Sequence, residues 1–118
     1  MRTRVLIVDD DPRVRALARA LLQAAGYAVA AEAADGAQAL AAVRRVRPDA
    51  AIVDVQLPDT DGLALARTLV DSDSGLRIVL TSTDPTLVSV AALAESPAVA
   101  FVPKDELAIT DLAPWLCG

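Results

Sequence analysis

Three carboxylates in this chain follow runs of apolar residues, where they could act on a ligand. Asp54 comes directly after the run formed by residues 51–53, and Asp9 and Asp10 come after residues 5–8. Continuous runs of this kind, rich in β-branched residues, predict strands of a parallel sheet that is buried on both faces. Because the carboxyl ends of parallel strands meet at one edge of the sheet, we expect the three carboxylates to share a crevice.

Such an acidic cluster favours a hard divalent cation. Like charges in a partly buried site raise one another's pKa, so three carboxylates cannot all stay ionised there without a counter-charge. The ligands on offer are oxygens, which favours Mg²⁺ held by one or two carboxylates, a backbone carbonyl and waters over a softer metal. Asp54, at the end of the third predicted strand, is then a candidate nucleophile.

Two further residues at predicted strand ends could meet an anion. Thr81 ends the fourth predicted strand, and Lys104 follows the fifth. Lysine supplies a compact positive charge, and the threonine hydroxyl can donate a hydrogen bond. Together with a nucleophilic Asp54, they fit an incoming phosphoryl group.

Several of these acidic and polar residues also have a simpler structural interpretation. Asp11 is better explained as a cap of the first predicted helix, and Asp59 and Asp61 as turn and cap residues than as ligands. Thr81 alone could be an ordinary strand residue, and Lys104 alone a solvated surface charge. Each structural interpretation is acceptable for one residue alone. Applied to all of them together it is improbable, because coincidence would have to place the whole set on one edge of the sheet.

The composition excludes several other kinds of site. Histidine is absent and Cys117 is the only cysteine, which rules out histidine triads, Cys–His pairs, the usual zinc sites and an internal disulfide within these residues. The net charge of −5 gives no electrostatic footprint for nucleic acid, so direct binding to DNA is not expected. The apolar run near the start is too short for a signal peptide or a membrane span, which predicts no membrane contact and a cytoplasmic protein.

The remaining sequence alternates predicted strands with helical segments. Strands are expected over residues 5–8, 27–33, 50–54, 77–81 and 99–102. Apolar residues at helical spacing separate the strands; Asp35 caps the second helix, and Asp84-Pro85 opens a fourth that continues through Val88 and Leu93. This alternation predicts an α/β fold with a doubly wound parallel sheet, formed by residues 1–118 as one domain.

The last part of the chain is the least regular. Leu107, Ile109, Leu112 and Leu116 could line a helix, yet Pro114 would have to lie in its first turn. We therefore expect a short or interrupted final helix.

Four motifs occur in order at the predicted strands. They are Val-Leu-Ile-Val-Asp-Asp at the first, Ile-Val-Asp-Val-Gln-Leu-Pro-Asp-Thr-Asp-Gly around the third, Ile-Val-Leu-Thr-Ser at the fourth and Phe-Val-Pro-Lys at the fifth. Each is weak by itself, but all four in this order and spacing are highly specific. From Arg4 to about Lys104 the chain resembles the receiver domain of two-component response regulators. The resemblance implies a flavodoxin-like, five-stranded sheet with strand order 2-1-3-4-5.

The resemblance also implies a role for the reactive residues. Asp54 would accept a phosphoryl group, and Lys104 would pair with a phosphate oxygen. Thr81 would move toward the phosphate, and Phe101 would be the switch aromatic that turns inward in response. Such a protein catalyses only its own phosphorylation and slow dephosphorylation, so it would not be an enzyme acting on a separate substrate.

A magnesium site and protein partners follow from the same resemblance. Mg²⁺ would be bound by the carboxylates of Asp10 and Asp54, by Asp9 mainly through water, and by the backbone carbonyl of Gln56. The implied partners are a sensor histidine kinase, which would supply the phosphohistidine, and a downstream effector domain or protein. A weak homodimer remains open.

Two other functions fit parts of the sequence. One is a receiver-like interaction module that works without phosphorylation, although the complete set of candidate residues argues against it. The other is a phosphohydrolase of the haloacid dehalogenase type, which would also use a strand-end Asp as nucleophile. Those enzymes usually carry a second Asp two residues on, and here that position is Gln56.

Overall fold

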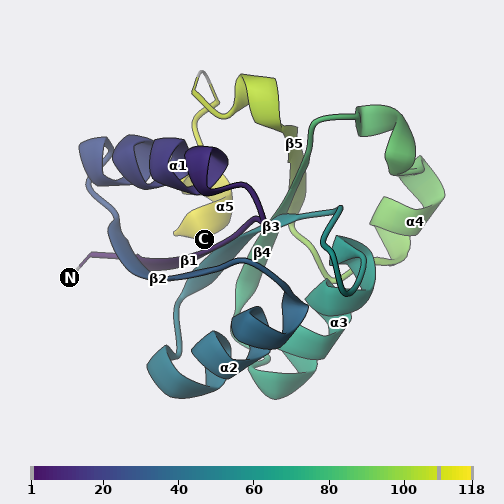
Figure 1. Ribbon diagram of the computed structural model, residues 1–118, viewed down its shortest axis with the longest axis horizontal. Helices are drawn as coiled ribbons and strands as arrows, with labels where there is room; N and C mark the ends of the chain where they lie inside the picture. Colours follow the sequence, from purple (N-terminus) through teal and green to yellow (C-terminus); the bar gives the residue numbers. More distant parts are fainter. Residues whose placement is uncertain (1, 109, 118) are drawn as a thin grey trace.

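The computed structural model describes residues 2–108 and 110–117 and contains a five-stranded parallel sheet of order β2-β1-β3-β4-β5 (Figure 1). The strands are β1 (Arg4–Val8), β2 (Ala28–Ala33), β3 (Ala50–Asp54), β4 (Arg77–Ser82) and β5 (Ala100–Pro103). The helices are α1 (Pro12–Ala24), α2 (Gly36–Val46), α3 (Gly62–Ser72), α4 (Val90–Glu95) and α5 (Ala113–Leu116). The predicted fold and strand order are confirmed, with strand ends that agree to within one residue.

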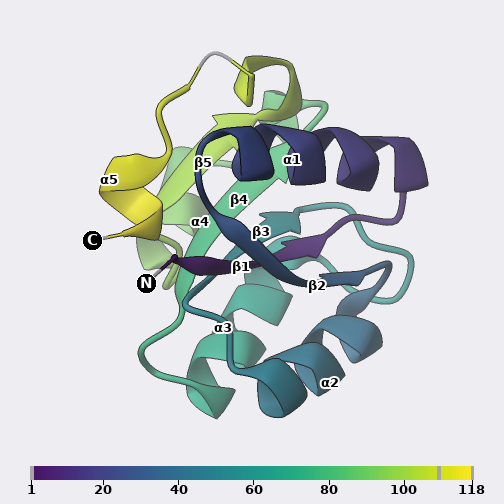
Figure 2. The same ribbon diagram turned by 90° about the vertical axis from the view of Figure 1, so that its left-hand side faces the viewer.

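Helices lie on both faces of this sheet (Figures 1 and 2). On one face, under α2 and α3, Leu6 and Val53 pack with Leu69 of α3. On the other face, Val5 and Ile52 pack with residues of α1 and α5. Side chains that alternate along one strand therefore enter different cores, which explains why the strands read as unbroken apolar runs.

Aspartates begin the three long helices. Asp11, Asp35 and Asp61 are the N-caps of α1, α2 and α3, and each side chain accepts a first-turn backbone N–H, at 2.9, 2.8 and 2.7 Å respectively. The predicted caps at these positions are confirmed. Because these helices begin at the edge where β1, β2 and β3 end, the caps also fix the loops around that edge.

The fourth helix is shorter than the sequence predicted. Asp84 caps only a 3₁₀ turn over Pro85–Leu87, after which Val88 is extended and Ser89 caps a separate helix, α4. The Ser89 hydroxyl accepts the Ala92 N–H at 3.0 Å. The expectation of one helix from Pro85 through Leu93 was wrong, because two capping side chains lie five residues apart and each satisfies its own turn.

The final helix is short, as predicted. It consists of Ala113–Leu116, with Pro114 in its first turn and Leu116 buried in the core. Lys104–Glu106 form a 3₁₀ turn, and neither buried Leu107 nor residues 110–112 belong to a helix. The expectation that Ile109 contributes to a helix concerns a residue outside the described part of the chain.

Candidate functional site

The three candidate carboxylates meet at the carboxyl edge of the sheet. β1 and β3 are neighbours, and Val8 lies opposite Val53 in their register, so the residues that follow leave the sheet side by side. One oxygen from each of Asp9, Asp10 and Asp54 lies within 4.8 Å of the other two. Asp9 and Asp54 are only 3% and 4% exposed, whereas Asp10 is exposed. The predicted acidic crevice is present in the structure.

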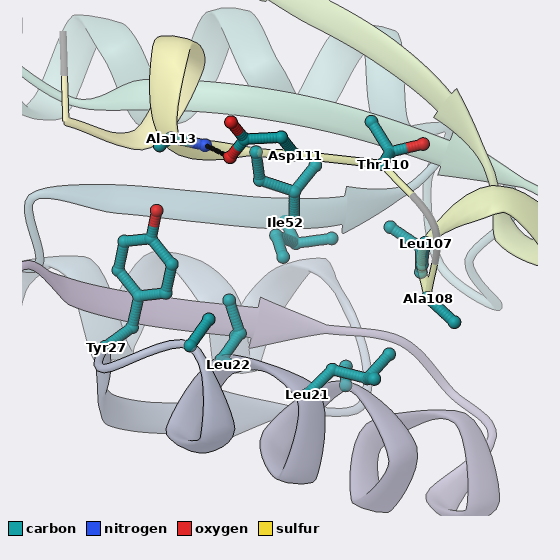
Figure 3. Close-up of a pocket in the computed structure, with 12 residues that line it drawn as sticks. Leu21, Leu22, Tyr27, Ile52, Leu107, Ala108, Thr110, Asp111 and Ala113 are labelled. Carbon is teal, nitrogen blue, oxygen red and sulfur yellow. Dashed lines mark hydrogen bonds between the residues drawn. The ribbon is translucent and has the colours of Figure 1, made fainter.

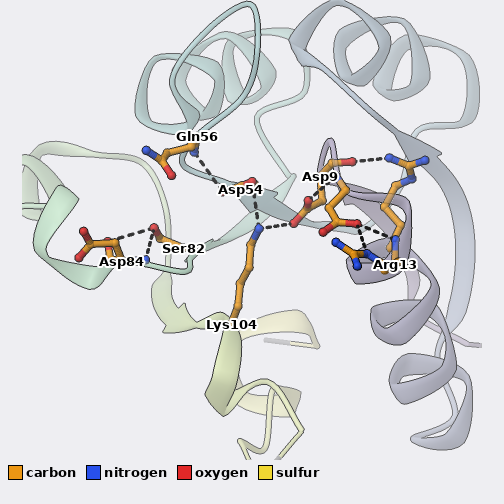
Figure 4. A network of polar contacts seen from close by, with 9 residues as sticks. Asp9, Arg13, Asp54, Gln56, Ser82, Asp84 and Lys104 are labelled. Atoms are coloured by element: carbon orange, nitrogen blue, oxygen red, sulfur yellow. Dashed lines mark hydrogen bonds and ion pairs between the residues drawn. The ribbon is translucent and has the colours of Figure 1, made fainter.

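Lys104 reaches the same crevice from the other side (Figure 4). It follows β5, two strands away from β3, and its Nζ lies 2.7 Å from Asp9 Oδ2 and 3.1 Å from Asp54 Oδ2. Its side chain is 13% exposed, so Lys104 is not the solvated surface charge that it could have been in isolation. One ammonium group therefore holds together the ends of β1, β3 and β5.

Burial and hydrogen bonding shift the pKa values of this pair. Burial raises the pKa of Asp54 above its ordinary value, although the Gln56 backbone N–H at 3.0 Å and Lys104 act in the opposite direction. Burial lowers the pKa of Lys104, but its hydrogen bonds with Asp9 and Asp54 outweigh this effect and the pKa is raised overall. The Asp54 carboxylate is therefore charged beside Lys104 in a buried setting that favours its neutral form, so a group that bonds to this oxygen and disperses its charge would relieve that cost.

Arg15 is a supporting residue that the sequence did not reveal. Its guanidinium donates to the backbone carbonyl of Asp9 at 2.6 Å and lies 3.5 Å from Glu32 of β2. The Asp9 carboxylate accepts the Asp11 N–H at 2.9 Å. The only sequence signal was that Arg15 lies one turn into the helix that follows the acidic residues, and exposed arginines are just as common there.

Thr81 and Phe101 lie on the strands between Asp54 and Lys104. Thr81 is 2% exposed and pairs with Asp54 in the register of β3 and β4. Phe101, on β5, lies opposite Leu80 of β4. It is partly buried and packs against the core on the α2 and α3 face. Thr81 is therefore the strand neighbour of Asp54, whereas Phe101 lies one strand further away, in the core beside β4.

The loop after Asp54 is tied down at several points. Gln56 pairs with Asp61 as an isolated antiparallel bridge, and the Gly62 N–H donates to the Val55 carbonyl at 2.7 Å. At Gly62 a Cβ would lie 2.5 Å from the Asp54 carbonyl oxygen, so only glycine fits against the strand end. Asp59 in this loop is a capping residue, as predicted, but it serves α2 rather than the helix that follows it.

A hollow elsewhere in the molecule is unrelated to these carboxylates (Figure 3). It has a volume of about 270 Å³ and lies between α1 and the segment before α5, lined mainly by apolar residues such as Leu21, Leu22 and Ile52. Leu107 and Leu112, from the chain before α5, line its other side. The acidic edge of the sheet, with its buried titratable groups, is the site at which chemistry is expected.

The fold and the acidic crevice define a receiver-type α/β protein: a parallel sheet of order β2-β1-β3-β4-β5 with three aspartates and a lysine at its carboxyl edge. In the part of the chain that the structure describes, none of the helices combines the length and apolar character needed to cross a lipid bilayer.

Comparisons with known proteins agree with this class. The family model for the response regulator receiver domain matches residues 5–113. The DNA-binding response regulator MtrA of Mycolicibacterium smegmatis is 39% identical over 104 residues, which make up 88% of this chain and 45% of that protein. The chain spans about half the length of the curated relatives that it matches.

Solved structures give the same result. A two-component response regulator of the LuxR family from Aurantimonas sp. SI85-9A1 has a TM-score of 0.80 at 32% identity, covering 88% of this chain and 75% of that one. The response regulator TrrA of Thermotoga maritima, solved in complex with Mg²⁺-BeF, has a TM-score of 0.77 at 28% identity, covering 87% and 86%. This chain belongs to the response regulator receiver domain family.

Proposed function

We propose that this protein is a phosphoacceptor in a two-component system and that Asp54 takes a phosphoryl group from a phosphohistidine of a sensor kinase. The observation that carries the proposal is the buried Asp54 carboxylate, 3.1 Å from the Lys104 ammonium and clustered with Asp9 and Asp10. A carboxylate in this position is a nucleophile with a cation already beside it.

The transfer exchanges one bond of phosphorus for another. An Asp54 carboxylate oxygen attacks the phosphorus, the bond from phosphorus to the imidazole nitrogen breaks, and its electron pair stays on that nitrogen. Lys104 then pairs with a phosphoryl oxygen in place of its present contact with Asp54. The protein acts on itself in this step and in the slow hydrolysis of the acyl phosphate, so we assign it no separate substrate.

A magnesium ion fits the residues at this site. The clustered donors are carboxylate oxygens, which are hard ligands of the kind Mg²⁺ prefers. Asp10 and Asp54 would bind the ion through their carboxylates, Asp9 mainly through water, and Gln56 through its backbone carbonyl. When bound, Mg²⁺ supplies positive charge that offsets the charge of the phosphoryl oxygens. The TrrA relative, solved with Mg²⁺-BeF, supports this assignment.

Thr81 and Phe101 form the proposed switch. Thr81 lies opposite Asp54 in the register of β3 and β4, which supports a role in which its hydroxyl donates a hydrogen bond to a phosphoryl oxygen on Asp54. Movement of Thr81 toward the phosphate would open space on β4, and the partly buried Phe101 on β5 would turn inward. The surface over β4 and β5 would then differ between the two states.

The proposed partners are a sensor histidine kinase and a downstream effector. Residues 1–118 would form one receiver domain in the cytoplasm, and any DNA binding would belong to the effector, because the charge of −5 on this chain opposes contact with phosphate backbones. The MtrA relative, which is described as DNA-binding and is about twice as long, supports an effector of this kind. A weak homodimer is compatible with this role.

Intact-mass spectrometry tests the proposal. Incubation with acetyl phosphate and Mg²⁺ should add one phosphoryl group to the wild-type protein, and Asp54→Asn should abolish the addition. Asp61→Asn is the matched control, because asparagine also caps helices and residue 61 should not be the acceptor. The absence of an adduct on the wild-type protein, or an undiminished adduct on Asp54→Asn, would contradict the proposal and favour an interaction module that works without phosphorylation.

A further inference from the structure

Asp59 links two parts of the molecule that are distant in sequence. It lies in the loop between β3 and α3, yet its carboxylate accepts the backbone N–H groups of Gly36 and Ala37, at 2.8 and 3.1 Å, in the first turn of α2. These hydrogen bonds, that of Gly36 first, lower the pKa of Asp59 below its ordinary value. Asp59 therefore supplies to α2 the two bonds that its own N-cap residue does not make.

The loop lies directly against the start of α2. A Cβ built at Gly36 would lie 2.6 Å from Thr60 Cγ2 and 3.3 Å from Asp59 Oδ1. The first distance is shorter than real Cβ atoms show and the second is tighter than most, so a side chain at residue 36 would require Thr60 to shift. The position of Asp59 and Thr60 is thus set by α2 as well as by their own chain.

The same loop carries the backbone of Gln56 next to Asp54. The bridge between Gln56 and Asp61 closes the loop, so that Asp59 lies on a short closed segment whose first residue is Gln56. The Gln56 N–H donates to Asp54 Oδ1 at 3.0 Å. Asp59 and the Gln56 peptide group that donates to the Asp54 carboxylate therefore belong to one short closed loop.

We propose that Asp59 is a positioning residue that fixes the Gln56 backbone, and through it Asp54, by fastening the loop to α2. The inference rests on the proposed function, because it assigns Asp59 a part in Mg²⁺ binding and phosphoryl transfer at Asp54. The Asp59 carboxylate accepts N–H groups of α2, so it would contact neither the metal nor the phosphoryl group, and its effect would pass through Gln56.

Magnesium affinity measured by titration calorimetry tests this inference. Asp59→Ala should weaken Mg²⁺ binding roughly tenfold, the lower end of what loss of a partner behind a metal ligand costs. Asp35→Ala is the matched control: Asp35 caps the same helix through Gln38, at 2.8 Å, and is not part of the loop. It should reduce the stability of α2 but leave Mg²⁺ affinity unchanged. Equal affinities for Asp59→Ala and the wild type, or equal losses in both variants, would overturn the inference.

A compensating pair gives a second, independent result. Gly36→Ala should displace the loop by forcing the Thr60 methyl away, and should also weaken Mg²⁺ binding. Thr60→Ser removes that methyl, so the double variant should regain wild-type affinity to within about twofold. Failure of Thr60→Ser to restore affinity would mean that the loop and α2 are not coupled through this contact.

Hydrogen exchange without metal separates this inference from the proposed function. The Gln56 amide, which is bonded to Asp54, should exchange faster in Asp59→Ala than in the wild type or in Asp35→Ala. This result would support the proposed positioning of Gln56 by Asp59 even if the wild-type protein bound no Mg²⁺ and accepted no phosphoryl group. An unchanged Gln56 amide in Asp59→Ala would overturn it.

Discussion

The helices on the two sides of the acidic crevice differ in length and in how many residues they bury. On the side of β1 and β3, helices of 11–13 residues bury two to four residues each, among them Leu69 of α3, which is fully buried. On the side of β5, α4 has six residues, all of them described and none buried, and Val90 is 86% exposed. The candidate nucleophile and metal ligands lie on the well-packed side, whereas Phe101 and Lys104 lie on the thinly covered one.

Under the proposed function, this difference would let the protein change conformation on phosphorylation at a small cost in free energy. Segments with few buried contacts open with small free energies, and switching elements are drawn from such segments. The closely packed side can keep the reactive groups in place while the other side rearranges. Lys104, which joins the two sides by its contacts with Asp9 and Asp54, is the connection that phosphorylation would alter.

The largest expected effect compares one leucine from each side. Leu69→Ala should lower the free energy of unfolding by about 3 kcal/mol, because it leaves a cavity in a closed core. Leu93→Ala, in the partly buried face of α4, should cost about 1 kcal/mol, because solvent already reaches that site. Urea unfolding measures both, and similar losses would remove the contrast between the two sides.

A smaller effect is expected from replacing Lys104, whose ammonium group joins the two sides. Lys104→Met should lower the free energy of unfolding by about 2 kcal/mol in Mg²⁺-free buffer, since Asp9 and Asp54 lose a charged hydrogen-bond partner. The folded-state pKa of Lys104 is raised, so its contribution is complete below the unfolded value of about 10.4 and disappears as the pH rises through the folded value. Arg67→Met, at an exposed position on α3, is the control and should change stability by less than about 0.5 kcal/mol.

The smallest effect on stability is expected from removing the charge of Asp54, which lies on the well-packed side. Burial raises the folded-state pKa of Asp54, so its ionisation opposes folding at neutral pH, and Asp54→Asn should slightly stabilise the Mg²⁺-free protein. The gain should shrink as the pH falls through the folded value and vanish below the unfolded value of about 3.9. Thermal unfolding from neutral to acid pH checks this, and a variant less stable than wild type at neutral pH would show that Lys104 outweighs burial.

Asp59→Asn should show the opposite sign in the same experiment. Hydrogen bonds to α2, that of Gly36 first, lower the folded-state pKa of Asp59, so its contribution is present above the unfolded value and is lost as the pH falls through the folded one. The variant should be less stable than wild type at neutral pH, with a difference that disappears in acid. If Asp54→Asn and Asp59→Asn changed stability in the same direction at neutral pH, burial and hydrogen bonding of these two carboxylates would not have the opposite effects expected here.

Most of the fold could be predicted from local sequence patterns. Apolar runs marked the strands to within one residue, and Asp11, Asp35 and Asp61 marked the helix starts, because burial and capping depend on a few neighbouring residues. The pattern failed at α4, where Asp84 and Ser89 are both capping residues and nothing local says which one begins the helix. It also missed Arg15, whose partner is a backbone carbonyl six residues away.

The sequence by itself determined which residues could react and at which edge of the sheet they would meet, because a parallel sheet places its strand ends together. Only the tertiary structure decided what each of them contacts. It placed the Lys104 ammonium between Asp9 and Asp54 across two strands, and it directed Asp59 to the start of α2 rather than to its own helix. Contacts of this kind join residues 22 to 95 positions apart, so they depend on the packing of whole elements and leave no local trace in the sequence.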